Sequence, residues 1–454
     1  MKFDSVISGK IVTDKVFEGE IGVKNGKIMA IKDESGSMNG EKYYDCEGQY
    51  IFPGFIDSHV HCFSNPDEGI EKTTKAAAHG GITTIFDMPY DRPYPINHID
   101  LFKQKTEQVN KYAYVDMGLW GTIAKCKGTE QITKMAEYGA IGIKLSTFET
   151  DVERFPRIPD IQIKQAMELA KNAGILVAFH AESEEIIKSK ISEFKEKGLT
   201  KAIYHNLSRP PESESLAVIK LIELAYWTNS KIHLVHISHP HTVELIESFR
   251  KAYNVDVTFE TCYQYTTLST EDLKKYGSIA KCNPPLRTPD EVKCLTNQVL
   301  NNRIEFITSD HAPWVKDLNE TNIFNSPSGL TGLDIMIPVM FDRFINKGLL
   351  SIIQFKNMFS TNIARRFGIK NKGIIKEGYD ADLTVIDPKK TWQLDETCYE
   401  SISNQSVFNG EFLQGKVTKT FLRGTLIYDG EIKNKKMGQY IKGPGFKEEM
   451  LFEN

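Results

Sequence analysis

The chain has 454 residues, of which 40% are hydrophobic and 26% are charged, and its formal net charge at pH 7 is −4. This length suits one large domain plus a smaller one, and the weak negative charge argues against nucleic acid as a partner. No segment approaches the roughly 18 apolar residues of a membrane span, and the amino terminus lacks a signal-peptide pattern, so we expect a cytoplasmic protein with no membrane partner.

The first fifty residues are predicted to form strands. Segments 19–23 and 27–31 flank Asn25-Gly26, which is the strongest short-range signal for a hairpin. This region therefore predicts a small β unit at the amino terminus.

From residue 51 the pattern changes to short apolar strands that alternate with amphipathic helices, for example at 161–173 and 215–228. Alternation of this kind predicts parallel βα units. Eight such units predict an α/β fold with a TIM (β/α)8 barrel over residues 51–367. The eight predicted strands lie near residues 51–56, 82–87, 112–119, 141–145, 175–180, 231–237, 255–261 and 304–309.

The chain becomes β-rich again beyond the barrel region. We expect residues 1–50 and 368–435 to form one small, discontinuous β-sandwich domain built from both chain ends. The remaining segment, 436–454, is a polar C-terminal tail rich in glycine and lysine, which either docks on a neighbouring surface or stays mobile.

Two histidines, His59 and His61, stand at the end of the first predicted strand with a spacing of i, i+2. Side chains two residues apart on an extended backbone point to the same side, so the pair could chelate a metal ion. A lone H-x-H motif is a weak signal, and a structural role is equally open.

Further candidate ligands occur at the ends of other predicted strands, where a TIM barrel builds its active site. The fifth strand ends in His180, the sixth carries His236, and the eighth is followed by Asp310. A core role for His180 alone would be as plausible as ligation. Together with His59 and His61, however, these residues suit zinc or another borderline divalent ion.

Lys144 lies in the fourth predicted strand. Taken alone it would more often be a lysine that extends its amine to solvent, because lysine is rarely buried without a partner. Desolvation in a barrel interior would lower its pKa and expose a nucleophilic amine, which can add carbon dioxide to become a carbamate. A carbamylated Lys144 would complete a site for two divalent metal ions about 3.5–4 Å apart that share a hydroxide.

Other histidines serve as a comparison. His79 and His98 lie in helical or loop stretches, and His233 is expected to face the opposite side of its strand from His236. Structural roles are preferred for His205, His239 and His241.

These residues, in this order, resemble the amidohydrolase superfamily, and more narrowly its cyclic amidase branch of dihydroorotases, allantoinases and hydantoinases. The resemblance covers nearly the whole chain. The motifs that carry it are residues 53–61, 80–89, 283–287, 309–313, 372–373 and 378–383.

The resemblance implies that His59 and His61 hold one metal ion, that His180 and His236 hold the other, and that carbamylated Lys144 bridges them. Zinc is the first choice of metal. Because relatives are usually dimers or tetramers, the resemblance also implies a homo-oligomer.

The resemblance further implies that Asp310 ligates the first metal and acts as the catalytic proton shuttle, while Asn283 binds the substrate ring. The implied activity is hydrolysis of carbon–nitrogen bonds in cyclic amides (EC 3.5.2 type) through a binuclear metal-bound hydroxide. For Asp57, orienting a ligand and supporting a turn remain equally open.

The chain departs from the dihydroorotase pattern at two positions. Dihydroorotases typically carry an arginine and an asparagine that clamp a carboxylate, where this chain has Phe63 and Tyr90. An apolar side chain and a phenol cannot replace a guanidinium. Residues 146–150 also lack the tyrosine that hydantoinases use as an oxyanion donor, and Gln264 stands where allantoinases often have histidine.

We therefore expect a small-molecule substrate, with an allantoin- or hydantoin-like ring as the first choice. A dihydroorotase-type reaction on a related ring is the alternative, and a non-catalytic scaffold is a remote third interpretation. Arg154 and Arg157, after the fourth predicted strand, are the candidates for reaching a substrate carboxylate.

Overall fold

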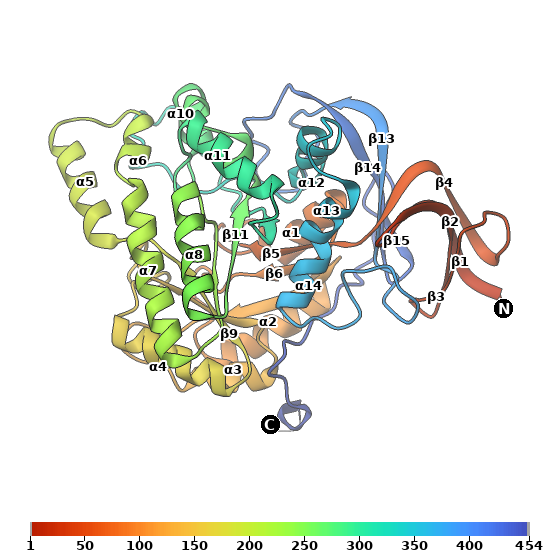
Figure 1. Cartoon of the computed structure of the whole chain (residues 1–454), viewed down its shortest axis with the longest axis horizontal. Coiled ribbons are helices and arrows are strands. Elements are labelled where there is room, and N and C mark those ends of the chain that lie inside the picture. Colours follow the sequence, from red (N-terminus) through yellow and green to blue (C-terminus); the bar gives the residue numbers. More distant parts are fainter. Residues whose placement is uncertain (1, 452–454) are drawn as a thin grey trace.

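The computed structural model describes residues 2–451, which form a closed barrel of parallel strands beside a separate mixed sheet (Figure 1). The eight barrel strands pair in chain order and are all parallel. The barrel closes where Val60 pairs with His311. Its strands are β5 (Phe55–Val60), β6 (Ile82–Asp87), β7 (Asp116–Gly121), β8 (Gly142–Ser146), β9 (Leu176–His180), β10 (Ile232–Leu234), β11 (Val257–Cys262) and β12 (Phe306–Thr308).

Helices surround the barrel, and the predicted TIM (β/α)8 architecture is confirmed. The predicted helices at 161–173 and 215–228 correspond to α4 (Asp160–Asn172) and α7 (Pro211–Thr228). No helix among residues 2–451 has both the length and the apolar character needed to cross a bilayer. The α-helices are α1 (Gly69–His79), α2 (Ile99–Tyr112), α3 (Gln131–Tyr138), α4 (Asp160–Asn172), α5 (Glu184–Glu196), α6 (Ile203–Leu207), α7 (Pro211–Thr228), α8 (Pro240–Tyr253), α9 (Tyr263–Thr267), α10 (Thr270–Tyr276), α11 (Pro289–Leu300), α12 (Met336–Met340), α13 (Ile352–Lys356) and α14 (Asn362–Arg366).

Large apolar side chains fill the barrel interior, because alternate residues of every strand point inward. Phe86 and Trp120, from neighbouring strands, pack against Phe367 just after α14, with ring centroids 5.1 and 5.5 Å away.

The second sheet joins both ends of the chain, as predicted. Its strand order is β15-β14-β13-β4-β1-β2-β3, and only the β1–β4 pairing is parallel. Figure 1 shows these strands to one side of the barrel. The strands are β1 (Lys2–Val12), β2 (Val16–Lys24), β3 (Lys27–Lys32), β4 (Asn39–Pro53), β13 (Leu383–Gln393), β14 (Phe412–Leu422) and β15 (Thr425–Tyr428).

The predicted first barrel strand at 51–56 is wrong in position. Its first half completes β4, which pairs with β13, and the barrel strand begins only at Phe55. The break falls at Gly54, where an added Cβ would lie 2.0 Å from the Thr83 hydroxyl oxygen. One continuous apolar run therefore serves two different sheets.

The described part of the C-terminal tail docks on the chain's own barrel. The Met117 N–H donates to the Gln439 carbonyl at 2.9 Å, and the Ile441 N–H donates to the Met117 carbonyl at 2.8 Å. A short 3-10 helix, η4 (Glu448–Leu451), follows. Residues 452–454 of the predicted tail lie outside the described residues.

Candidate metal centre and active site

A cavity of about 590 Å3 lies at the carboxyl ends of the barrel strands. It is lined by side chains from loops that are far apart in the sequence, together with all the predicted metal ligands and the predicted ring-binding residue. Those predicted residues are His59, His61, Lys144, His180, His236, Asn283 and Asp310.

Strand β5 and the end of β12 bring together three potential metal ligands. His59 Nε2 lies 3.1 Å and His61 Nε2 lies 3.3 Å from the same oxygen of Asp310. Ligand atoms of the three residues lie within 4.8 Å of one another. Burial by itself would raise the pKa of Asp310, but the two imidazoles hold it well below its usual range.

A second pair of imidazoles lies next to this group. His180 Nδ1 and His236 Nε2 are 2.9 Å apart, and the His236 ring centroid lies 5.5 Å from that of His59. The positive φ of His236 (44°) turns its side chain at the end of β10. All four imidazoles therefore face one space.

Lys144 lies in the same cavity without a polar partner. It is 1% exposed, and its Nζ forms no hydrogen bond. Desolvation lowers its pKa to about 7, although Glu260 and Asp310 act in the opposite direction. An amine in this environment is available in its neutral, nucleophilic form near pH 7.

The donor set fits divalent metal ions. Imidazole nitrogens and a carboxylate suit zinc and similar borderline ions, and a modified lysine would add oxygen donors. The unpartnered amine of Lys144 and the unpartnered Nδ1 of His61 are buried polar atoms of the kind that need a ligand or solvent.

Two buried carboxylates contact these imidazoles on the side away from the cavity. Neither of them was predicted from the sequence. Glu260, on β11, accepts from His59 Nδ1 at 2.6 Å and from the Ser58 hydroxyl at 3.1 Å. Hydrogen bonds from His233 and His59 keep the pKa of Glu260 below its usual range, against the effect of burial. This leaves His59 Nε2 facing the cavity.

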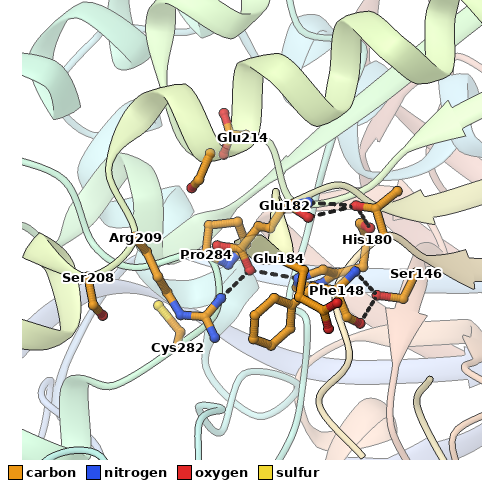
Figure 2. A network of polar contacts seen from close by, with 12 residues as sticks. Ser146, Phe148, His180, Glu182, Glu184, Ser208, Arg209, Glu214, Cys282 and Pro284 are labelled. Atoms are coloured by element: carbon orange, nitrogen blue, oxygen red, sulfur yellow. Dashed lines mark hydrogen bonds and ion pairs between the residues drawn. The ribbon is translucent and has the colours of Figure 1, made fainter. Parts of the chain in front are cut away.

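Glu182 orients the His180 imidazole in the same way (Figure 2). Its carboxylate lies 2.7 Å from His180 Nε2 and also pairs with Arg209, whose guanidinium lies 4.6 Å from the centroid of the Phe148 ring. Burial would raise the pKa of Glu182, but Arg209 and His180 lower it to about 2. A charged residue within or just after a buried strand is the signal that could have revealed Glu182 and Glu260.

His233 departs from its prediction. Its Nε2 lies 3.1 Å from Glu260 Oε2, so it shares the inward network instead of facing away from it. Strand β10 ends at Leu234, and the positive φ at His236 breaks the alternation on which the prediction relied. Asp57 accepts from the backbone N–H groups of His59 and Ser309, a role in chain geometry that links β5 to the end of β12.

The other histidines have structural partners. His79 contacts Asp334 at 3.1 Å, His98 accepts from the first turn of α2, and His239 does the same for α8. His205 lines the cavity and lies 2.8 Å from the Cys282 carbonyl.

The substrate side of the cavity differs from the dihydroorotase pattern. Tyr90 lines it, whereas Phe63 is not among the lining residues. Arg154 lines the cavity, but Arg157 pairs with Glu184 at 3.1 Å and does not. Asn283 also lines it, and its Oδ1 is buried without a partner.

Comparison with known proteins places the chain in a family. Residues 50–427 match the model of the Amidohydrolase family. The chain is 32% identical to an allantoinase of Rubrobacter xylanophilus, over 97% of this chain and 96% of that protein. It is also 32% identical to an allantoinase of Bacillus licheniformis, over 97% and 100%.

The L-hydantoinase (dihydropyrimidinase) of Arthrobacter aurescens has a similar solved structure. The TM-score is 0.92 at 28% identity, and the match covers 97% of this chain and all of that one. This likeness agrees with a TIM barrel carrying a β-sandwich domain. The chain belongs to the amidohydrolase family, in its cyclic amidase branch.

Proposed function

We propose that the protein is a metal-dependent hydrolase that opens an allantoin- or hydantoin-like ring. The observation that carries this proposal is the set of four imidazoles, Asp310 and an unpartnered buried Lys144 around one cavity. The names of the allantoinase and hydantoinase relatives support the choice of ring.

His59, His61 and Asp310 would hold one divalent ion, His180 and His236 would hold a second, and carbamylated Lys144 would contact both. When bound, the ions supply an activated water and polarise the amide carbonyl. The carboxylates of Glu260 and Glu182 fix which imidazole nitrogen faces the cavity.

In this proposal Asp310 moves the proton. Its carboxylate takes a proton from the attacking water and delivers it to the ring nitrogen as the carbon–nitrogen bond breaks. The products are a new carboxylate and a free ureide or amide nitrogen. Asn283 would orient the ring, because its unpartnered Oδ1 can accept a hydrogen bond from a ring N–H group.

The test compares Lys144→Ala with wild type for metal content and for ring opening. The variant should lose metal and activity, and short carboxylic acids should restore part of both by occupying the place of the carbamate. Lys356→Ala removes another buried lysine, one that pairs with Asp14 and does not line the cavity, so it should keep both properties. Full metal and full activity in Lys144→Ala would contradict the bridging role.

The same assay covers the alternatives through its substrate panel of hydantoins, allantoin, dihydropyrimidines and dihydroorotate. A cation in the cavity, Arg154, favours the dihydroorotase-type alternative on a related ring. If the metal-loaded protein opened none of these rings, the scaffold interpretation would replace the proposed function.

A further inference from the structure

One wall of the cavity carries two guanidinium groups. Arg154 follows β8 and Arg92 follows β6, and both line the cavity. Within residues 2–451 neither side chain forms an ion pair with a carboxylate, whereas nearby Arg157 pairs with Glu184. The wall therefore has positive charge that the chain does not neutralise by direct contact.

Arg154 is held in place and keeps unused donors. Its backbone N–H donates to Asp151 at 2.9 Å, and its Nη1 donates to the Tyr90 carbonyl at 2.7 Å. The residue is only 9% exposed, and its Nε is buried without a partner. A buried charge with unpaired donors is costly unless a ligand completes its contacts.

The two carboxylates that act on the charge of Arg154, Asp91 and Asp151, form no ion pair with its guanidinium. Both oxygens of Asp91 accept from Lys105, at 2.7 and 2.6 Å. Asp151 accepts from the backbone N–H groups of Glu153 and Arg154 in its own turn. Burial and then the like charge of Arg92 lower the pKa of Arg154, and Asp151 and Asp91 offset only part of this effect.

This wall adjoins the candidate metal centre. The Tyr90 ring stacks on Phe155 with centroids 3.7 Å apart, and the Phe155 ring lies 5.5 Å from that of His180. The Tyr90 hydroxyl donates to the Lys144 carbonyl at 3.2 Å. A planar ring whose amide lies at the metal ligands can therefore extend a substituent along the aromatic pair toward Arg154.

We propose that Arg154, assisted by Arg92 at the cavity mouth, binds a carboxylate on a substituent of the substrate ring. The preferred substrate is then a cyclic amide or ureide with an anionic side group. A guanidinium recognises a carboxylate through two parallel hydrogen bonds, which supplies both charge and geometry. This inference rests on the proposed function and narrows its substrate class.

The test uses hydantoin-5-acetate and its uncharged counterpart hydantoin-5-acetamide with metal-loaded protein. Wild type should prefer the carboxylate. Arg154→Met should lower kcat/KM for the carboxylate roughly 10- to 100-fold, the loss expected for charged hydrogen bonds, and should change the amide little. Arg154→Lys should recover only part of the lost kcat/KM, because lysine keeps the positive charge but lacks the two parallel N–H donors of a guanidinium.

Arg92→Met provides a second variant that does not depend on a buried position, and it should weaken use of the carboxylate alone by several-fold. Arg157→Met is the matched control, since its pairing with Glu184 lies outside the cavity, and it should match wild type with both compounds. Equal loss on both compounds in Arg154→Met would mean that Arg154 only supports the Tyr90 loop, and would overturn the proposal.

Calorimetric binding of the same two compounds separates this inference from the proposed function. Charge-dependent binding that needs Arg154, without turnover of any ring, would support the carboxylate subsite and contradict the hydrolase. Ring opening with no preference for the carboxylate in kinetics or binding would support the hydrolase and overturn the subsite.

Discussion

Glu260 shows how one buried carboxylate can determine the geometry of a metal ligand. It contacts His59, Ser58 and His233, which come from two other strands of the barrel. With Nδ1 engaged by Glu260, His59 has only Nε2 to offer to an ion. Carboxylates in this position both orient an imidazole and raise its basicity.

Replacing this carboxylate should weaken metal binding more than it changes the fold. We expect Glu260→Gln to lower metal affinity roughly 10- to 100-fold, as is usual when the partner of a ligating histidine is altered. Metal retained after dialysis against a graded series of chelator concentrations measures this. Glu247→Gln, which alters a surface pair with Arg303, is the control. Identical retention in the two variants would argue against the orienting role.

At the scale of elements, the start of α11 shows how local signals anchor the loops around the barrel. Thr288 and Glu291 form a capping box, and Pro289 occupies the first turn. Glu291 also lies 3.0 Å from His239, the N-cap of α8. Two neighbouring helices thus share one ionic contact at their amino ends.

The charge of Glu291 should make stability depend on pH. The hydrogen bond from His239 lowers its pKa from 4.5 to about 2. A carboxyl group with a depressed folded-state pKa stabilises the fold above its unfolded-state pKa, and this contribution disappears as the pH falls through the folded-state value. The free energy of unfolding of Glu291→Gln should be about 0.5–1 kcal/mol lower than that of wild type at pH 7.

Urea unfolding at pH 7 and at successive steps below pH 4.5 measures this difference, which should shrink toward zero near pH 2. Asp290→Asn changes an exposed acidic residue in the same turn and is the control, with an expected effect under about 0.5 kcal/mol. A difference for Glu291→Gln that stayed constant with pH would show that its carboxylate charge is not the cause.

At the scale of the whole molecule, a buried ionic cluster joins the barrel to the small sheet and the C-terminal segment. Asp116, at the start of β7, accepts from Lys372 at 2.8 Å and from Arg423 at 2.8 and 2.6 Å. Lys372 also pairs with Asp382, and the Gln439 N–H donates to Asp116 at 2.8 Å. Four segments distant in sequence meet at this point.

Removing the central cation should destabilise the protein strongly. Lys372→Met leaves the buried Asp382 carboxylate without its cation and Asp116 with Arg423 alone, and breaking a buried ion pair in this way typically costs about 3–5 kcal/mol. Chemical denaturation followed by circular dichroism measures the loss. Lys2→Met, in an exposed pair with Glu41, should change stability by less than about 1 kcal/mol. Similar values for the two variants would mean that the cluster does not hold the segments together.

Much of the fold was predictable because apolar periodicity and strand-end position are local properties of a chain. The exceptions occur where a contact between strands or a change of backbone conformation interrupts the local pattern. The run at 51–56 looks like one strand, but it is divided at Gly54 by the close approach of Thr83 from a neighbouring strand. His233 was misplaced because the backbone at His236 leaves the strand conformation.

The candidate metal ligands that line the cavity were predictable as a set, because parallel strands of a barrel end at the same face. Their partners were harder to predict: a charged residue within or just after a buried strand marks Glu260 and Glu182, but that Glu260 contacts His59 and that Arg209 pairs with Glu182 depends on contacts between separate elements. Arg154 and Arg157 were equivalent candidates in the sequence. The structure separates them, since Glu184 pairs with Arg157 while Arg154 faces the cavity.

The order and types of residues thus establish the barrel and the candidate ligands, because both follow from periodicities within short segments. The orientation of each imidazole, the surroundings of Lys144 and the uncompensated charge of Arg154 depend on contacts between residues far apart in the chain. Such contacts are set by packing and by the removal of water from buried polar groups, which local sequence does not encode.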